Sequence, residues 1–161
     1  MSSHTPAQGT PTANVAAAEA LAADLERIVM GSVSLTTLAL EEAGAGFELT
    51  FPQWRALLVV GEGEDGARIG EVAARVGVTL PATGRLLRRL ERRGLTALAV
   101  DAQDRRATRV RLTDRGSAVR AAILAYRRAA IMDLARVLPE PGLLSLADGI
   151  RAIALEFTRF T

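Results

Sequence analysis

The residue types that usually carry catalytic or metal-binding chemistry are nearly absent from this 161-residue chain. It contains no cysteine and one histidine, His4. Without thiols, a disulfide framework, a thiolate zinc site, an iron–sulfur site and a thiol redox switch are excluded. A histidine-based metal site or a Ser-His-Asp triad would have to be built on His4 alone. We therefore predict no catalytic residue, no metal site and no cofactor, and we expect that the protein is not an enzyme.

The chemistry that the sequence does offer is that of arginine. All twenty basic residues are arginines, and eleven of them lie within residues 68–111, together with only four acidic residues. That segment carries a net charge of +7, whereas the whole chain carries +2. A basic segment between acidic flanks predicts a surface that binds a polyanion such as nucleic acid. A solvated helix face with scattered arginines is the alternative that charge alone leaves open.

Residues 61–66 (GEGEDG) have the spacing G-x-G-x-x-G of dinucleotide-binding loops. Such a loop needs a strand before it and a helix N-terminus after it, whereas here a helix is expected to precede it. Its three acidic residues would also repel a pyrophosphate. We reject the nucleotide-binding interpretation and predict a flexible loop.

Local signals place the basic segment on a helix-turn-helix. Residues 70–76 (GEVAARV) read as a short helix, preceded by Ile69 on a very short strand. A glycine turn follows, and Thr79 is the predicted N-cap of a second helix that runs to about Arg93. Gly94 supplies the C-terminal stop of this helix. A short helix, a glycine turn and a capped helix form the helix-turn-helix pattern.

A β-hairpin is predicted directly after the second helix. Residues 95–100 and 107–112 read as two strands, and the second alternates apolar and basic residues with the period of a strand. The connecting residues DAQDRR form a polar turn. This hairpin is the wing of a winged helix-turn-helix.

Longer helices are predicted on both sides of this motif. Residues 15–42 show apolar spacing of three and four, and Thr50 caps a helix to Val60 with Gln53 at the capping-box position. After the hairpin, Thr113 caps a helix that ends at the prolines near residue 139, and a last helix spans about 143–160. A winged helix of about 60 residues is too small to bury all these apolar faces, which predicts a two-fold dimer.

The sequence therefore predicts a mainly α fold with a small β-hairpin wing: a winged helix-turn-helix with N- and C-terminal dimerisation helices. The predicted parts are a disordered N-terminal tail, a dimerisation helix, the DNA-binding winged helix and the C-terminal dimerisation helices, at residues 1–14, 15–49, 50–112 and 113–161.

Residues 69–116 resemble the MarR (multiple-antibiotic-resistance regulator) family of winged-helix transcription regulators. The matching pieces are EVAARVGV, TLPATGRLLRRLERRGL, the wing tip DRRA and the exit RLTDRG, and LTFPQWRALLVV resembles the family's preceding helix. The resemblance implies a homodimeric, sequence-specific regulator, a repressor relieved by a small-molecule effector. It would read a palindromic operator with helix 79–93 in the major groove and wing 101–108 in the minor groove. Leu80, Pro81, Gly84 and Arg88 depart from the family pattern, and Gly84 costs its helix about 1 kcal/mol relative to alanine.

Ten residues are predicted to form the DNA interface. Arginine can bridge guanine O6 and N7, and small residues let the backbone approach the groove. The resemblance implies that Asp104 orients Arg106 for the minor groove, whose negative potential attracts arginine. Ion pairs of Arg85 and Arg89 within the protein, and a surface ion pair in the wing, are the alternatives. The predicted interface consists of Thr79, Pro81, Ala82, Thr83, Arg85, Arg88, Arg89, Asp104, Arg105 and Arg106.

The resemblance also implies a small aromatic or anionic effector, bound between the dimerisation and DNA-binding regions. Phe51, Trp54 and Arg55 lie where the first long helix ends and the second helix begins, so they are the predicted pocket residues. The alternative, which we prefer, is that these aromatic residues pack in the core.

Neither a membrane span nor a signal peptide is predicted. Charged residues interrupt every apolar stretch well before about 18–20 residues, and residues 1–14 lack the basic and apolar regions of a signal peptide. We expect a cytoplasmic protein without a membrane partner, whose partners are double-stranded DNA, a second copy of the chain and a small-molecule ligand. A winged-helix module that binds protein without binding DNA is the alternative function, and an enzyme built on residues 61–66 has the least support.

Overall fold

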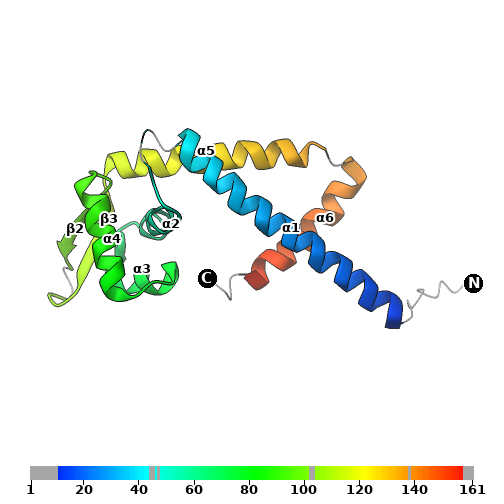
Figure 1. Ribbon diagram of the computed structural model, residues 1–161, viewed down its shortest axis with the longest axis horizontal. Coiled ribbons are helices and arrows are strands. Elements are labelled where there is room, and N and C mark those ends of the chain that lie inside the picture. The colour runs from blue at the N-terminus through cyan, green and yellow to red at the C-terminus, as the bar shows by residue number, and fades with distance from the viewer. Residues whose placement is uncertain (1–10, 44–45, 47, 102–103, 138, 158–161) are drawn as a thin grey trace, which may run out of the picture. The chain divides into compact units, whose positions relative to one another are not determined.

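The computed structural model describes residues 11–43, 46, 48–101, 104–137 and 139–157. In chain order its elements are α1 (Pro11–Ala43), α2 (Phe51–Val60), β1 (Ala67–Arg68), α3 (Ile69–Val76), α4 (Leu80–Arg92), β2 (Thr96–Val100), β3 (Thr108–Leu112), α5 (Asp114–Ala135) and α6 (Glu140–Phe157) (Figure 1). The chain divides into two compact units, residues 1–36 and 37–161. The predicted mainly α fold with a small β wing is confirmed.

Local caps explain why three helices begin where the sequence places them. The backbone N–H of Thr50 donates to Gln53 Oε1 over 3.0 Å at the start of α2. Thr79 Oγ1 accepts a hydrogen bond from the N–H of Ala82 at the start of α4, over 3.4 Å. Thr113 Oγ1 accepts one from the N–H of Gly116 at the start of α5, over 3.0 Å. Each cap satisfies a backbone group that the first helical turn leaves without an intrahelical partner.

The outer ends of the terminal helices differ from the prediction by a few residues. α1 begins at Pro11, four residues before the predicted start at Val15, and a proline fits the first turn of a helix because its missing N–H is not needed there. The rest of the predicted tail, residues 1–10, lies outside the described residues. α6 spans Glu140–Phe157 rather than about 143–160.

The wing belongs to a three-stranded antiparallel sheet with the order β1-β3-β2. Val110 lies at its centre, opposite Leu98 on β2 and Ala67 on β1. The short strand predicted at Ile69 is in fact Ala67–Arg68, and Ile69 opens α3. The strand lies at Ala67–Arg68 because these two residues pair with β3. The pairing buries Ala67, which is 1% exposed.

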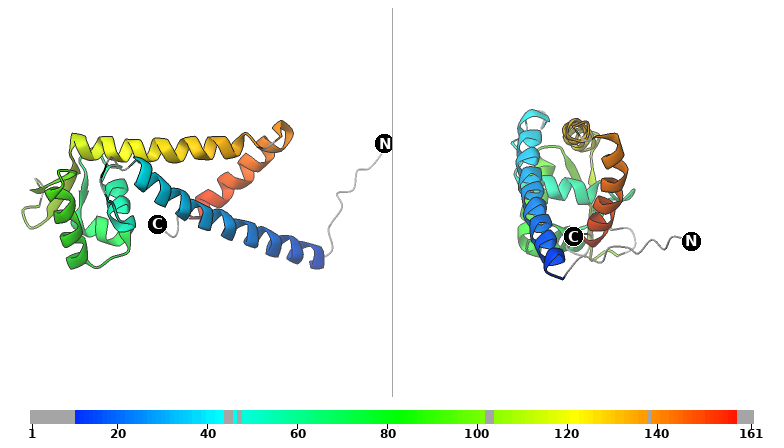
Figure 2. Two further views of the ribbon diagram at one scale, coloured as in Figure 1. Left: turned by 45° about the horizontal axis from the view of Figure 1, so that its top comes forward. Right: turned by 90° about the vertical axis from the view of Figure 1, so that its right-hand side faces the viewer.

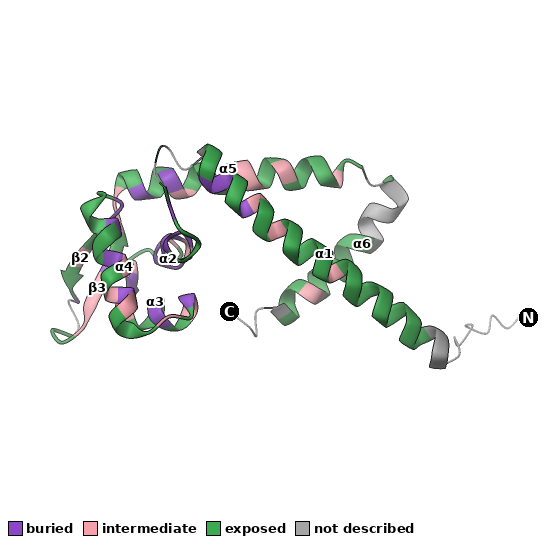
Figure 3. Ribbon diagram, viewed as in Figure 1, coloured by how far each residue is buried: buried purple, intermediate pink, exposed green. Residues whose placement is uncertain are grey.

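One hydrophobic core holds the winged helix together. α2, α4, β3 and the first part of α5 supply its large buried side chains, among them Trp54, Leu57, Leu87, Val110 and Ile123. Figure 3 shows buried residues gathered in these elements, whereas the far part of α5 is mostly exposed. α5 leaves the sheet as one long helix (Figure 2). The core therefore fixes α4 and the wing against each other.

Candidate nucleic-acid interface

The recognition helix α4 has one buried face and one basic face. Leu87 and Leu90 are fully buried, and Arg85, Arg88 and Arg89 are exposed. Within the described residues, none of these three arginines forms an ion pair with an acidic side chain. Their guanidinium groups are therefore available to an external anion.

Thr83 is the one predicted interface residue that the structure places inside the protein. It is 0% exposed, and its hydroxyl donates to the carbonyl oxygen of Thr79 over 3.1 Å. Thr83 lies four residues before Leu87 and so shares the buried face of the helix. Its assignment to the DNA-facing surface is corrected on this ground. The interface residues of α4 that remain are Thr79, Pro81, Ala82, Arg85, Arg88 and Arg89.

A groove separates the recognition helix from the wing. It encloses about 610 Å³ and is lined by the start of α3, by one side of α4 and by the wing. Arg88 of α4 and Arg106 of the wing, both predicted from the sequence, line it together. Arg68 lines it as well, from the end of β1, and was not predicted. Three arginines from three segments thus line one groove, together with the acidic Glu71 of α3.

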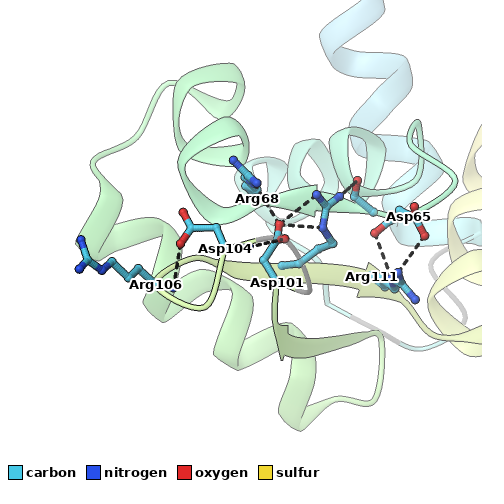
Figure 4. A network of polar contacts seen from close by, with 8 residues as sticks. Asp65, Arg68, Asp101, Asp104, Arg106 and Arg111 are labelled. Carbon is cyan, nitrogen blue, oxygen red and sulfur yellow. Dashed lines mark hydrogen bonds and ion pairs between the residues drawn. The ribbon is translucent and has the colours of Figure 1, made fainter.

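The wing tip is shaped by Asp104 through the backbone. Asp104 Oδ1 accepts a hydrogen bond from the backbone N–H of Arg106 over 3.0 Å, and Asp104 O accepts one from the N–H of Ala107 over 2.9 Å. Figure 4 shows the side chain of Arg106 extending away from the other labelled residues. Asp104 thus orients the chain that carries Arg106 and leaves the guanidinium group of Arg106 free to bind. Arg105 is exposed beside it.

The base of the wing is held by Asp101, a residue that the sequence analysis did not single out. Its side chain is only 1% exposed, and Oδ2 accepts hydrogen bonds from Arg68 Nε over 3.0 Å and from Arg109 Nε over 3.1 Å (Figure 4). Oδ1 accepts a third from the N–H of Asp104 over 3.3 Å. One carboxylate therefore ties β1, β3 and the wing turn together, and it also positions Arg68 beside the groove.

A larger cavity lies on the other side of the recognition helix. It encloses about 1240 Å³ between the end of α1, the start of α2 and the last turn of α4. Arg89, Arg92 and Arg93 line it, as do the acidic residues Glu41 and Glu48. Arg93 is anchored there by a hydrogen bond from its guanidinium group to the carbonyl oxygen of Glu48, over 2.9 Å. A ligand in this cavity would contact the same helix that carries Arg88.

Of the three predicted effector-pocket residues, Phe51 lines this cavity. Trp54 is 1% exposed and belongs to the core, as in the alternative that the sequence favoured. Arg55 donates to the carbonyl oxygen of Arg75 over 2.6 Å and so joins α2 to α3. Arg75 in turn donates to the carboxylate of Glu62 over 2.6 Å, and this hydrogen bond raises the pKa of Arg75 above its ordinary value.

The glycine-rich loop 61–66 follows helix α2 and leads into strand β1, so it has the reverse of the order that a dinucleotide site requires. Asp65 of this loop forms an ion pair with Arg111, with 2.8 Å between Asp65 Oδ1 and the Arg111 guanidinium nitrogen. Among the described residues, no group of histidine, aspartate and glutamate side chains is arranged to hold a metal ion. None of the described helices is both long enough and apolar enough to cross a membrane.

Comparisons with known proteins agree with this geometry. Residues 47–107 match the model of the MarR family, while no curated protein matches the chain. The structure of RV1404 from Mycobacterium tuberculosis is 20% identical with a TM-score of 0.75, covering 94% of this chain and 97% of that one. CouR from Rhodococcus jostii RHA1 bound to p-coumaroyl-CoA is 25% identical with a TM-score of 0.61, covering 81% and 88% of the two chains. A mutant of S. aureus MepR bound to an oligodeoxyribonucleotide is 22% identical with a TM-score of 0.61, covering 85% and 97%. The shared fold extends along most of the chain, and the family match spans the recognition helix and most of the wing, so residues 47–107 form a winged-helix domain of the MarR family.

Proposed function

We propose that this protein is a homodimeric transcription regulator that binds a palindromic operator and releases it when a small molecule binds. The observation that carries the proposal is the groove where Arg68, Arg88 and Arg106 meet. In this proposal α4 enters the major groove and the wing reaches the neighbouring minor groove. The MepR complex with an oligodeoxyribonucleotide, on the same fold, supports DNA as the ligand.

Exposed apolar side chains on the terminal helices support a dimer. Ile131 and Leu134 of α5 and Ile150 and Leu155 of α6 are between 50% and 68% exposed in one protomer. Helices with this much exposed apolar surface are usually covered by a partner. A two-fold dimer would place two recognition helices about 34 Å apart, in successive major grooves of a palindromic operator.

Control by an effector is supported by the cavity of about 1240 Å³. Phe51 offers an aromatic face there, and Arg89 and Arg92 offer positive charge to an anionic group. A ligand that binds one position of α4 better than another shifts the population of the DNA-binding state. The CouR complex with p-coumaroyl-CoA is a case of a small-molecule ligand on this fold. We propose a small aromatic or anionic effector, and repression as the activity that it relieves.

Selection of genomic DNA fragments by the purified protein, followed by sequencing, tests this function. About 150 mM salt suppresses nonspecific binding. We expect a palindromic motif with half-sites about one helical turn apart. The double variant Arg88→Ala/Arg106→Ala is the negative control for DNA selection, because it removes two arginines of the groove and leaves the core intact. No enrichment by a folded, dimeric wild-type protein would overturn the proposal in favour of a winged helix that binds protein.

The same operator fragment tests the effector. Benzoate is a suitable first probe because it combines an aromatic ring with one negative charge. We expect it, or a larger aromatic acid, to release the operator from the wild-type protein and to have less effect on an Arg92→Ala variant. Equal release from both proteins would place the ligand outside this cavity.

A further inference from the structure

Gly84 is the residue of the recognition helix that the packing of the protein does not explain. It lies in the middle of α4, on the side that lines the groove, together with Pro81 and Arg88. Glycine in a helix interior is less favourable than alanine, because its backbone loses more freedom on folding. A glycine at this position therefore lowers the stability of the helix.

Nothing inside the protein requires that glycine. Its backbone is helical, and a Cβ atom added to it would meet only the guanidinium NH2 of Arg88, at 3.6 Å. That distance is an ordinary van der Waals contact with the end of a flexible side chain. At Gly66 and Gly116, by contrast, an added Cβ would lie 2.0 Å and 1.9 Å from a backbone oxygen. Packing explains those two glycines and leaves Gly84 without an internal reason.

The residues around Gly84 indicate which kind of ligand would occupy the open space beside it. Arg68 and Arg106 line the same groove, as does the acidic Glu71, and Arg88 lies one helical turn further along α4. Bare backbone beside Arg88, in a groove that two further arginines line, suits a polyanion that approaches closely and is bound on several sides.

We propose that Gly84 is a specificity-determining residue, at which the operator approaches the backbone of the recognition helix more closely than any side chain would permit. The inference rests on the proposed function, in which α4 enters the major groove. The close approach lets Arg88 reach the base edges, while Arg106 on the wing reaches the neighbouring minor groove and Arg68 binds a flanking phosphate. A side chain at position 84 holds the helix away from the bases and leaves the phosphate contacts largely intact.

The variants Gly84→Ala and Gly84→Leu test this role through two readouts that move in opposite directions. Gly84→Ala raises the midpoint of thermal unfolding by about 2–4 °C, because the helix gains stability. The same variant binds the selected operator at least about fivefold more weakly, and Gly84→Leu binds more weakly still. The salt dependence of binding stays close to that of the wild type, because phosphate contacts remain.

Gly149→Ala is the control. Within a single chain Gly149 lies in α6 with open space around it, so this change has the same effect on helix propensity outside the winged helix. Because α6 belongs to the proposed dimer, sedimentation first checks that this variant is as dimeric as the wild type. The variant leaves operator affinity unchanged.

Two outcomes overturn the inference about Gly84 alone: operator affinity of Gly84→Ala within about twofold of wild type, or a lowered unfolding midpoint. A wild-type protein that selects no DNA sequence overturns the proposed function itself, and the inference with it.

Discussion

At the scale of single residues, Asp101 holds the wing in position against the sheet. Its buried carboxylate accepts hydrogen bonds from Arg68, Arg109 and the backbone of Asp104, which belong to three different segments. A buried carboxylate is tolerated only when charge and hydrogen bonds compensate for its lost hydration. The positions of Arg68 and of the wing turn therefore depend on the same group.

Asp101→Asn should destabilise the protein and weaken DNA binding together. The amide keeps the shape of the side chain but leaves two arginines facing a neutral group, so we expect a loss of about 1–3 kcal/mol in the free energy of unfolding. Urea unfolding measures this loss, and a binding titration with operator DNA measures the second effect. Asp65→Asn is the control, because its ion pair with Arg111 is exposed and should contribute under about 1 kcal/mol. Equal losses in both variants would contradict the special role of Asp101.

Arg106→Ala should weaken DNA binding broadly and make it less sensitive to salt. Each lost phosphate-type contact lowers the slope of log affinity against log salt by about 0.9. Binding titrations at several salt concentrations give this slope. Arg111→Ala removes an arginine that pairs with Asp65, so its slope should match that of the wild type. An Arg106→Ala variant with unchanged affinity and slope would remove Arg106 from the interface.

At the scale of elements, the close contact between α5 and the sheet fixes where the long helix begins. A Cβ atom on Gly116 would lie 1.9 Å from the carbonyl oxygen of Leu95, and Leu95 is fully buried. Thr113 adds a hydrogen bond from its hydroxyl to the carbonyl oxygen of Gly94, over 2.6 Å. The first turn of α5 therefore packs directly on the chain that enters β2.

Gly116→Ala should separate these two segments and cost about 2–3 kcal/mol of the free energy of unfolding, as overpacking does elsewhere. Gly31→Ala in α1 is the matched control, since an added Cβ there meets nothing within 4 Å. Thermal or urea unfolding of both variants gives the comparison. If Gly116→Ala proved as stable as the wild type, the contact at Leu95 would have to be looser than described.

The sequence predicts those elements whose determinants are local and misses those that depend on distant residues. Caps such as Thr79 act within one helical turn, so the start of α4 could be predicted. β1 exists only through its pairing with β3, and Asp101 has its role only through Arg68, 33 residues away in the chain. The burial of Thr83, by contrast, could have been predicted from the sequence. Thr83 lies four residues before Leu87, so both side chains are on the same face of the helix.

At the scale of the whole molecule, a single chain leaves apolar residues exposed on α1, α5 and α6. On α1 they include Val15, Leu21 and Ile28, between 51% and 62% exposed. The core of the winged helix is complete without them. If the proposed dimer forms through these faces, its assembly does not depend on the same residues as the folding of the winged helix. A single charge in the apolar face of α6 should then disrupt the dimer and leave the winged helix folded.

Ile150→Asp places that charge, since Ile150 is 51% exposed in the protomer. Sedimentation should show a shift from dimer to monomer, because an aspartate buried in an apolar interface has no partner. Operator affinity should then fall by about 100-fold or more, because a monomer engages only one half-site and loses the effective concentration of the second. Arg151→Ala, which removes only an exposed ion pair with Asp148, should stay dimeric. A dimeric Ile150→Asp protein with full operator affinity would exclude α6 from the interface, and the dimer would then have to be built on α1 and α5 alone.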